Sequence, residues 1–484
     1  MVFSSSIFLF WFLPIFLGVY FLVDKRYKNA VALLASLLFY GFGSPVFLLV
    51  LLLSIIIDFF IVRQIDKSQD AKRRKLFLVF SIILNIGLLA FFKYANFFVD
   101  NFNAVLSAFG TSPVRWTKIL LPIGISFFTF QKMSYSIDVY RKTSAPLKSI
   151  TDYALFIMLF PQLIAGPIVR YNELADQITD RSANETVDNK IGGFYRFVIG
   201  LSKKMLIANI LAEYADQVFA LPTAGIGLST AWLGILAYTF QIYFDFSGYS
   251  DMAIGIGRMI GFKFPENFNN PYISRSISEF WKRWHITLGS WMMDYLYIPL
   301  GGNRKGKGRT YLNLWIVFFL SGLWHGAAWT FVVWGAYHGL FICLDKLLSG
   351  KRKVKSEKLK VKSSFFTFHS TLLTFLIVMI GWVLFRSDTI GYAVHYVGAM
   401  FGANGNTPAL FVNSQFVVTL IIAAFFSFFG LTKAGDKALN FFFNRKEYST
   451  GQVIWVGLVM IVLLVFSASF ILKGSFNPFI YFRF

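Results

Sequence analysis

The sequence predicts an all-α, polytopic integral membrane protein of about eleven transmembrane helices with additional re-entrant segments. Composition is the first reason, because 56% of the 484 residues are hydrophobic and only 14% are charged, whereas soluble domains carry about 25% charged residues. So little polar surface excludes a soluble enzyme, a disordered protein and a nucleic-acid-binding protein. The net charge of +22 is therefore interpreted as a sign of membrane topology, because Lys and Arg collect in the cytoplasmic loops of membrane proteins.

The N-terminal part contains three apolar stretches of spanning length. Phe8–Val23 is the first expected helix, with its N-terminus outside and no cleavable signal peptide before it, since no basic segment precedes it. Asn29–Val62 is broken by Gly41–Pro45, which predicts a turn and hence a helical hairpin. The next segment, Arg63–Lys75, carries six Lys and Arg residues, which indicates the cytoplasm. Leu76–Phe92 is expected to cross back.

The middle of the chain is less regular. Ile119–Gln131 is too short to span a bilayer and contains Pro122 and Gly124. It is expected to be a half-helix, which is tolerated only where protein surrounds it or where it lines a cavity. From Asp245 to Arg309 the apolar pieces are short. The expected spans before that segment are Tyr153–Ile168, Phe194–Leu211 and Leu228–Phe244.

The C-terminal part contains a long apolar segment, Tyr311–Leu347, between two basic ones. Arg304–Arg309 precedes it, and Lys351–Ser363, with seven basic residues and one Glu, follows it. Both flanks indicate the cytoplasm, so the segment between them must enter the membrane and return. We expect a single membrane-embedded domain over 1–484, with N-terminal helices in 1–118, a core in 119–347 and C-terminal helices in 364–484. The remaining spans are Thr371–Leu384, Phe416–Phe429 and Val453–Leu472.

His325 is the strongest candidate for a catalytic role. It lies within Ser321–Trp329, and no charged residue occurs between Arg309 and Asp345. The twelve residues from Asn313 to His325 rise about 18 Å in a helix, which places the imidazole deep in the membrane at the top of the hairpin. Ionisable groups at that depth are functional candidates, and a neutral imidazole can act as a base for a hydroxyl. The small residues that follow, Gly326, Ala327 and Ala328, leave room for a substrate channel. The alternative is a histidine that packs helices together.

The other histidines have weaker claims. His285 ends Phe280–His285, where Trp alternates with Lys and Arg as at a membrane interface, so a supporting functional role and a structural role remain equally open. His338 lies near the end of a span, and helix packing is the favoured interpretation. His369 and His395 are interpreted as hydrogen-bonded interfacial residues.

Other polar groups allow two interpretations each. Asp245 and Asp251 could be acid–base groups, but their spacing favours a role in holding helices. Cys343 is the single cysteine, which excludes an internal disulfide and a cysteine-based metal cage, and no metal site is predicted. The glycine-rich loop Gly301–Arg309 lacks the Gly-Lys-Ser/Thr of a phosphate-binding P-loop. It is either a topology signal or a landing site for an anionic acyl donor, through Arg304, Lys305 and Arg309.

The C-terminal tail, Phe476–Phe484, is rich in aromatic residues. An aromatic belt that anchors a helix end at the membrane interface is the favoured interpretation. If the tail lies outside the membrane, the hydroxyl of Tyr481 could instead form an ester and return it, which would make this residue a transient acyl relay.

Several motifs together resemble the membrane-bound O-acyltransferase (MBOAT) family, over roughly Leu121 to Asp345. Within the family, the resemblance is to the branch of the membrane subunit of alginate O-acetylation and its relatives in peptidoglycan and cellulose acetylation. The motifs that carry the resemblance are Leu121–Gln131, Phe160–Arg170, Pro265–Pro271, Phe280–Leu300 with the Gly-Gly-Asn-Arg loop, and Ser321–Gly339.

The resemblance implies an MBOAT-like fold in which the histidine matching His325 is catalytic and the one matching His285 has a less settled role. It implies transfer of an acetyl group from a cytoplasmic acyl thioester such as acetyl-CoA, with no permanently bound cofactor, to the hydroxyl of an extracytoplasmic polysaccharide. Membrane lipids, the polysaccharide and a periplasmic or membrane-tethered acetyltransferase are the expected partners, and the cell inner membrane is the expected location. The alternatives are long-chain acylation of a lipid or protein, and a non-catalytic transporter, which the absence of a visible internal repeat disfavours.

Overall fold

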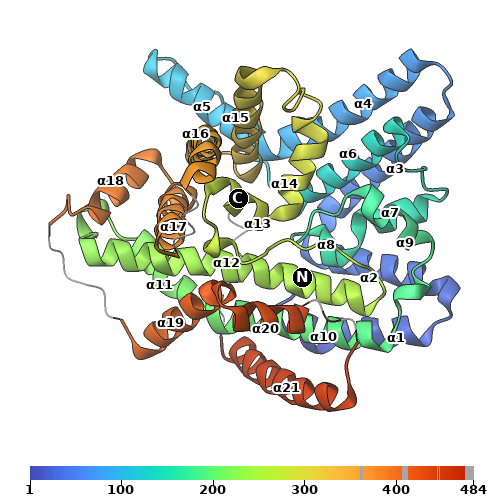
Figure 1. The fold of residues 1–484 in the computed structure, drawn as a ribbon. Coiled ribbons are helices and arrows are strands. Elements are labelled where there is room, and N and C mark those ends of the chain that lie inside the picture. The colour runs from blue at the N-terminus through green and yellow to red at the C-terminus, as the bar shows by residue number, and fades with distance from the viewer. Residues whose placement is uncertain (360–363, 406–411, 444, 446, 475–484) are drawn as a thin grey trace. The chain divides into compact units, whose positions relative to one another are not determined.

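The computed structural model describes residues 1–359, 364–405, 412–443, 445 and 447–474, and the side chains of these residues except 349–359 and 364–369. Every regular element in the described residues is a helix (Figure 1). The one β-type feature there is an isolated antiparallel bridge between Phe268 and Trp284. The predicted all-α fold is confirmed.

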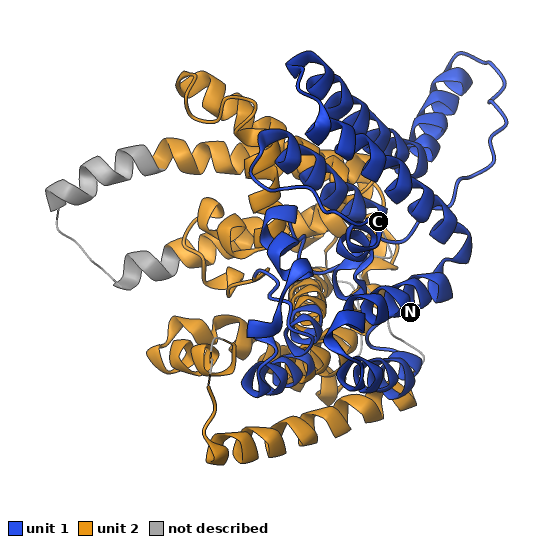
Figure 2. Ribbon diagram, turned by 90° about the vertical axis from the view of Figure 1, so that its right-hand side faces the viewer, with its two compact units in different colours: residues 1–197, 252–265 blue, residues 198–251, 266–484 orange. Residues whose placement is uncertain are grey.

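The chain divides into two compact units, coloured separately in Figure 2. The first comprises residues 1–197 and 252–265, and the second comprises 198–251 and 266–484. The chain passes between the units three times: within helix α10 (Val187–Ser202), within helix α12 (Leu228–Met259) and between Pro265 and Glu266. The histidines that the sequence singles out, His285 and His325, both belong to the second unit.

The first unit contains the predicted helical hairpin, formed by α2 and α3. Helix α2 ends at Gly43 and α3 begins at Pro45, because a proline at the first helical position starts a helix without losing a hydrogen bond. A π-helical turn, η3 (Ala90–Tyr94), joins α4 to α5. The helices are α1 (Leu13–Leu22, after the π-helix Phe8–Phe12), α2 (Lys28–Gly43), α3 (Pro45–Lys67), α4 (Ala71–Leu89), α5 (Ala95–Ala108), α6 (Ile125–Arg141), α7 (Ile150–Met158), α8 (Phe160–Leu163), α9 (Tyr171–Thr179) and the start of α10.

Two predicted segments of the first unit differ from the structure. Tyr153–Ile168 is not one helix, because the backbone of Leu159 is non-helical, with φ −50° and ψ 109°, and separates α7 from the single turn of α8. The predicted half-helix Ile119–Gln131 begins only at Ile125, because Gly124 has a positive φ of 79°. A side chain at Gly124 would also collide with backbone atoms of residues 163 and 164. From Ile125 the helix continues to Arg141.

Helix α12, the longest in the described residues, has most of its length in the second unit and extends well beyond the predicted Leu228–Phe244. Asp245 and Asp251 therefore lie inside a helix rather than at its edge. The helices of this unit are the end of α10, η5 (π, Lys203–Ala208), α11 (Asn209–Phe219), α12, α13 (Ile277–Arg283), α14 (Ile286–Met292), η8 (π, Met293–Tyr297), α15 (Gly306–His325), α16 (Trp329–Leu359), α17 (Ser364–Arg386), α18 (Ile390–Met400), α19 (Ser414–Phe428), α20 (Lys433–Phe443) and α21 (Thr450–Lys473).

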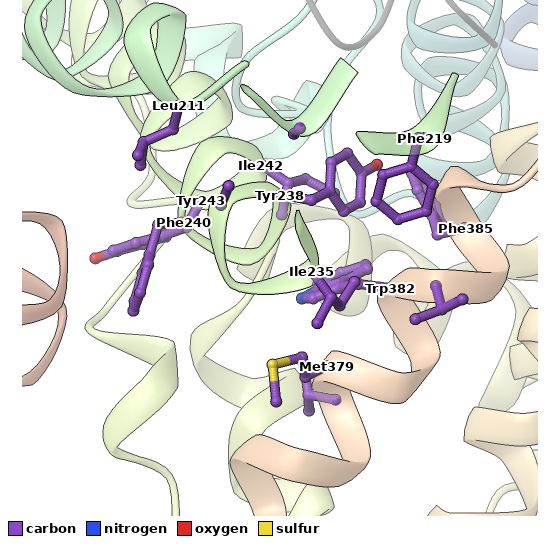
Figure 3. Close-up of a cluster of buried hydrophobic side chains, with 14 of the residues drawn as sticks. Leu211, Phe219, Ile235, Tyr238, Phe240, Ile242, Tyr243, Met379, Trp382 and Phe385 are labelled. Carbon is purple, nitrogen blue, oxygen red and sulfur yellow. The ribbon is translucent and has the colours of Figure 1, made fainter. Parts of the chain in front are cut away.

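The core of the second unit is largely aromatic. Figure 3 shows side chains of α11, α12 and α17 that pack together, with Phe219, Tyr238 and Trp382 among them. The rings of Phe219 and Tyr238 lie 5.8 Å apart. Trp382 also contacts Trp284, with 4.8 Å between ring centroids. This packing connects α17 to the segment that carries His285.

Among the described residues, five helices are long and apolar enough to cross a membrane, which supports a multi-pass protein. Phe8–Leu22 and Ser370–Arg386 are shorter apolar helices. The number of eleven crossings stays a prediction. The five helices are Pro45–Lys67, Ala71–Ala108, Trp329–Leu348, Ser414–Leu431 and Thr450–Lys473.

Candidate active site

The predicted hairpin around His325 is present. Helix α15 ends at His325, α16 begins four residues later at Trp329, and the two helices pack along each other (Figure 1). Glycines permit the close approach, since a Cβ atom on Gly335 would lie 2.6 Å from the carbonyl oxygen of Phe318. A Cβ atom on Gly322 would likewise collide with α16. Small residues at a helix–helix contact are typical of membrane proteins, and here they fix the end of α15 that carries His325.

Aromatic rings surround His325, which is 6% exposed. The ring centroids of Trp324, Trp334 and Phe385 lie 5.0, 5.2 and 5.3 Å from its own. These three side chains come from α15, α16 and α17. The structure corrects one expectation, because the space beside Gly326 is not open: the ring of Phe331 fills it.

His285 is the second buried imidazole of this region. Its ring centroid lies 6.4 Å from that of His325. It precedes α14 with φ 46° and ψ 51°, a left-handed conformation that is strained for a residue with a side chain. Such strain persists only where the surroundings impose it, and it is concentrated at functional sites.

A short backbone pairing imposes this conformation. The bridge between Phe268 and Trp284 is flanked by two hydrogen bonds, from Ile286 N to the Asn267 carbonyl and from Asn269 N to the Arg283 carbonyl, both 2.9 Å. The sequence therefore crosses from α13 to α14 through one left-handed residue, and that residue is His285.

The imidazole of His285 is buried and neutral. It is 2% exposed and lies outside the helices that are long and apolar enough to span a membrane. Burial lowers the pKa of His285 to about 3, because removal from water disfavours the charged form. Its Nδ1 contacts Asn267 Oδ1 at 3.0 Å.

A cavity of about 510 Å³ lies against these elements. His285, Trp281 and Ser321 are among its lining residues, and so are two cations, Lys282 and Lys346. His325 follows Ser321 by one helical turn on α15 but is not itself a lining residue. The cavity volume falls in the range of ordinary ligand sites, about 300–1,000 Å³.

The glycine-rich loop meets this cavity through Asn303, which is one of the lining residues. Asn303 Oδ1 accepts hydrogen bonds from the Tyr297 hydroxyl at 2.6 Å and from Lys346 Nζ at 3.1 Å. Gly301 and Gly302 both have positive φ, which explains the two glycines. Of the predicted donor contacts, Arg304 and Lys305 are exposed on the same loop, and Arg309 is exposed in the first turn of α15.

The other histidines and Tyr481 are not found at this site in the described residues. His338 is buried on α16, between the rings of Trp281 and Trp334 at 4.9 and 5.0 Å, as the helix-packing interpretation predicts. His395 is exposed on α18. The side chain of His369 and the whole of Tyr481 lie outside the described residues.

The sequence pattern does not single out Lys346, and it includes Asn267 only as part of a motif. No periodicity or spacing links either residue to His285, because the Asn267 contact and the shared cavity lining of Lys346 depend on how separate segments fold together. Among the described side chains there is no group of three or more His, Cys, Asp or Glu residues that could hold a metal ion.

Comparison with known proteins identifies related chains. The family model of the membrane-bound O-acyltransferase family matches residues 124–351, which include His285 and His325. A probable alginate O-acetylase AlgI of Pseudomonas putida is 43% identical, with 100% of both chains covered. The corresponding protein of Azotobacter vinelandii is 42% identical, also with 100% of both chains covered. A peptidoglycan O-acetyltransferase of Helicobacter pylori is 38% identical over 84% of this chain and 80% of its own.

Proposed function

Because the chain belongs to the membrane-bound O-acyltransferase family, we propose that it transfers an acetyl group from a cytoplasmic thioester to a hydroxyl of an extracytoplasmic polysaccharide. The chain is a membrane O-acyltransferase by family membership and by its relatives. The names of those relatives support acetyl as the acyl group and a polysaccharide as the acceptor. The cytoplasmic membrane is the proposed location.

His325 is the proposed base. One ring nitrogen takes the proton of the acceptor hydroxyl, and the hydroxyl oxygen attacks the carbonyl carbon of the thioester. The carbon–sulfur bond then breaks, and the leaving thiolate takes the proton from the imidazolium. The observation that carries this assignment is the position of His325 at the end of α15, 6.4 Å from His285 between ring centroids, where His285 lines the cavity.

The cavity is the proposed site for the thioester arm of the donor. Lys282, Lys346 and Asn303 belong to its lining. The chain continues from Asn303 through Arg304 and Lys305 to Arg309 in the first turn of α15. A cluster of cations attracts anionic ligands and raises their local concentration. The phosphates of acetyl-CoA would be drawn to this edge, and Trp281 and Met292 supply apolar walls for the arm. No permanently bound cofactor is required.

A second protein on the outer side is proposed to complete transfer to the polymer. The partner would be a periplasmic or membrane-tethered acetyltransferase that receives the acetyl group and places it on the polysaccharide. Tyr481, which lies outside the described residues, remains the predicted relay between the two.

Proteoliposomes test the proposal. The purified chain is given acetyl-CoA labelled in the acetyl group, together with alginate oligosaccharides, and both the released thiol and the label on the sugar are measured. An O-acetyltransferase releases free thiol from acetyl-CoA; because the outer-side partner is proposed to complete the transfer, label on the sugar is expected when that partner is added. A transporter would move the label across the membrane without breaking the thioester bond, and that result would contradict the proposal.

A further inference from the structure

The side-chain oxygen of Asn267 collects several hydrogen-bond contacts. Thr287 Oγ1 donates to Asn267 Oδ1 at 2.8 Å, and the backbone N–H of Thr287 donates to the same atom at 3.4 Å. His285 Nδ1 lies 3.0 Å away. On the other side of the amide, Asn267 Nδ2 donates to Ser250 Oγ at 3.0 Å. Asn267 and Ser250 are 1% and 2% exposed.

These contacts settle which way the amide of Asn267 faces. A backbone N–H can only donate a hydrogen bond, so the amide atom that faces Thr287 must be the oxygen. The same oxygen faces His285. An oxygen of a neutral amide can only accept, so Nδ1 of His285 must carry the proton. A neutral imidazole has one proton on its two nitrogens, which leaves Nε2 with its lone pair.

We infer that Asn267 is a positioning residue that holds His285 as the Nδ1–H tautomer, so that Nε2 accepts a hydrogen bond from the substrate in the cavity. This inference rests on the proposed function for the identity of the substrate, whose donating group is the hydroxyl of the acceptor or an amide N–H of the thioester donor's arm. Nε2 is buried and has no hydrogen-bond partner among the described residues. Buried polar atoms are rarely left unpaired, and His285 lines the cavity, so a bound molecule there can supply the missing donor.

The choice of an amide as the partner has a chemical consequence. A carboxylate beside Nδ1 would stabilise the imidazolium, whereas the neutral Asn267 fixes the tautomer without attracting a second proton. The titratable and charged groups nearest to this arrangement are His325, the cavity cations Lys282 and Lys346, and Asp251, which follows Ser250 in the sequence. The carboxylate of Asp251 is already paired with Lys203, at 2.6 Å.

Nuclear magnetic resonance of the full-length chain in nanodiscs tests the tautomer directly. The chain is labelled with ¹⁵N-histidine, and the signals of His285 are identified by comparison with His285→Gln. Couplings from the ring nitrogens to the ring C–H groups show which nitrogen carries the proton. We expect a proton on Nδ1 in the wild type. A proton on Nε2 would overturn the inference whatever the activity of the protein.

Two substitutions at Asn267 separate positioning from packing. Asn267→Leu removes the acceptor oxygen at nearly unchanged volume, and we expect a mixture of tautomers with kcat lowered by about tenfold or more, the scale of lost orienting partners. Asn267→Asp keeps an acceptor and should keep the Nδ1–H tautomer. The carboxylate should also raise the pKa of His285, because it stabilises the imidazolium. When the pH is lowered, Asn267→Asp should therefore lose activity at a pH about one or more units higher than the wild type does. An unchanged tautomer in Asn267→Leu, or an unchanged pH profile in Asn267→Asp, would contradict the inference.

Two serines on α12 provide a test in which Asn267 and His285 themselves are unchanged. Ser247 and Ser250 are both 2% exposed, but only Ser250 receives the Asn267 hydrogen bond. Ser250→Ala should weaken the tautomer preference and lower kcat, and Ser247→Ala should change neither; equal effects would count against the inference. If no variant and no wild type transfers acetyl, the proposed function fails while the tautomer measurement still decides this inference.

Discussion

Gly322 of α15 and Gly335 of α16 meet so closely that neither position has room for a Cβ atom. A Cβ atom on Gly322 would lie 2.9 Å from the Cα atom of Gly335. One on Gly335 would lie 2.6 Å from the Phe318 carbonyl oxygen. Because His325 follows Gly322 by three residues, this contact determines where the imidazole lies relative to Trp334 on the facing helix.

Gly322→Ala is therefore expected to destabilise the protein. Replacing glycine by alanine inside a helix normally stabilises it by about 1 kcal/mol, but forcing a methyl group into a filled contact costs about 1–3 kcal/mol. We expect a lower midpoint of thermal unfolding in detergent and a reduced kcat. Gly308→Ala, on the same helix with open space around it, is the control and should be neutral or stabilising. Equal midpoints for the two variants would contradict the close contact.

His325→Ala should lower the rate of acetyl transfer by about 10²–10⁴-fold, the usual contribution of a general base. The protein should still insert and accumulate, because the substitution removes a side chain from an aromatic pocket without adding a charge. The rate is measured as label transferred from acetyl-CoA. His395→Ala, at an exposed position of α18, is the control.

The base assignment fails if His325→Ala keeps activity within about threefold of the wild type, which corresponds to less than 1 kcal/mol of transition-state stabilisation. His285→Ala should lower the rate of acetyl transfer less than His325→Ala does, or should combine a lower rate with a loss of folding, since the strained backbone of His285 connects α13 to α14. A stable but fully inactive His285→Ala would give the two histidines equal importance.

Lys282→Gln and Lys346→Gln test the donor site. Both lysines are exposed at the cavity. Each substitution should therefore raise the KM for acetyl-CoA by only about two- to fivefold at low salt and leave kcat unchanged. The effect should shrink as salt rises, because exposed charges are screened over about 10 Å at 0.1 M ionic strength. A short acetyl thioester without phosphates should show no change in KM. Lys437→Gln, on α20 away from the cavity lining, is the control, and a similar KM change there would argue against the site.

The sequence predicted the hairpin of His325 because two basic segments flank a stretch without charges, and that pattern depends on topology alone. It did not predict the break between α7 and α8, because the segment is apolar throughout and is interpreted as one span, although Pro161 in the first turn of α8 marks the point where the helix cannot continue. The sequence did not predict the contact between Asn267 and His285 either. The isolated bridge that brings these two residues together joins two irregular segments, and such a bridge has no periodic sequence pattern. The open channel expected beside Gly326 was wrong because Phe331, in the first turn of α16, folds back over it.

The buried ion pair between Lys204 and Asp245 supports the last prediction. Lys204 Nζ lies 2.6 Å from Asp245 Oδ1, and the two side chains are 0% and 3% exposed. Both charges are held within the second unit, where the π-helical turn η5 faces α12. Removing one member of such a pair leaves an uncompensated charge, which costs about 3–5 kcal/mol, whereas replacing both members by apolar residues is often neutral or stabilising.

Lys204→Met should therefore lower the thermal unfolding midpoint strongly, and the double variant Lys204→Met with Asp245→Leu should recover most of the loss. The measurement is the fluorescence-detected midpoint in detergent at constant pH and salt. The exposed pair of Lys25 and Asp180, whose side chains are 64% and 63% exposed, is the control, and Lys25→Met should leave the midpoint unchanged because water already solvates both charges. A double variant as unstable as Lys204→Met alone would contradict this prediction, and would mean that the two polar side chains make further contacts that Met and Leu do not replace.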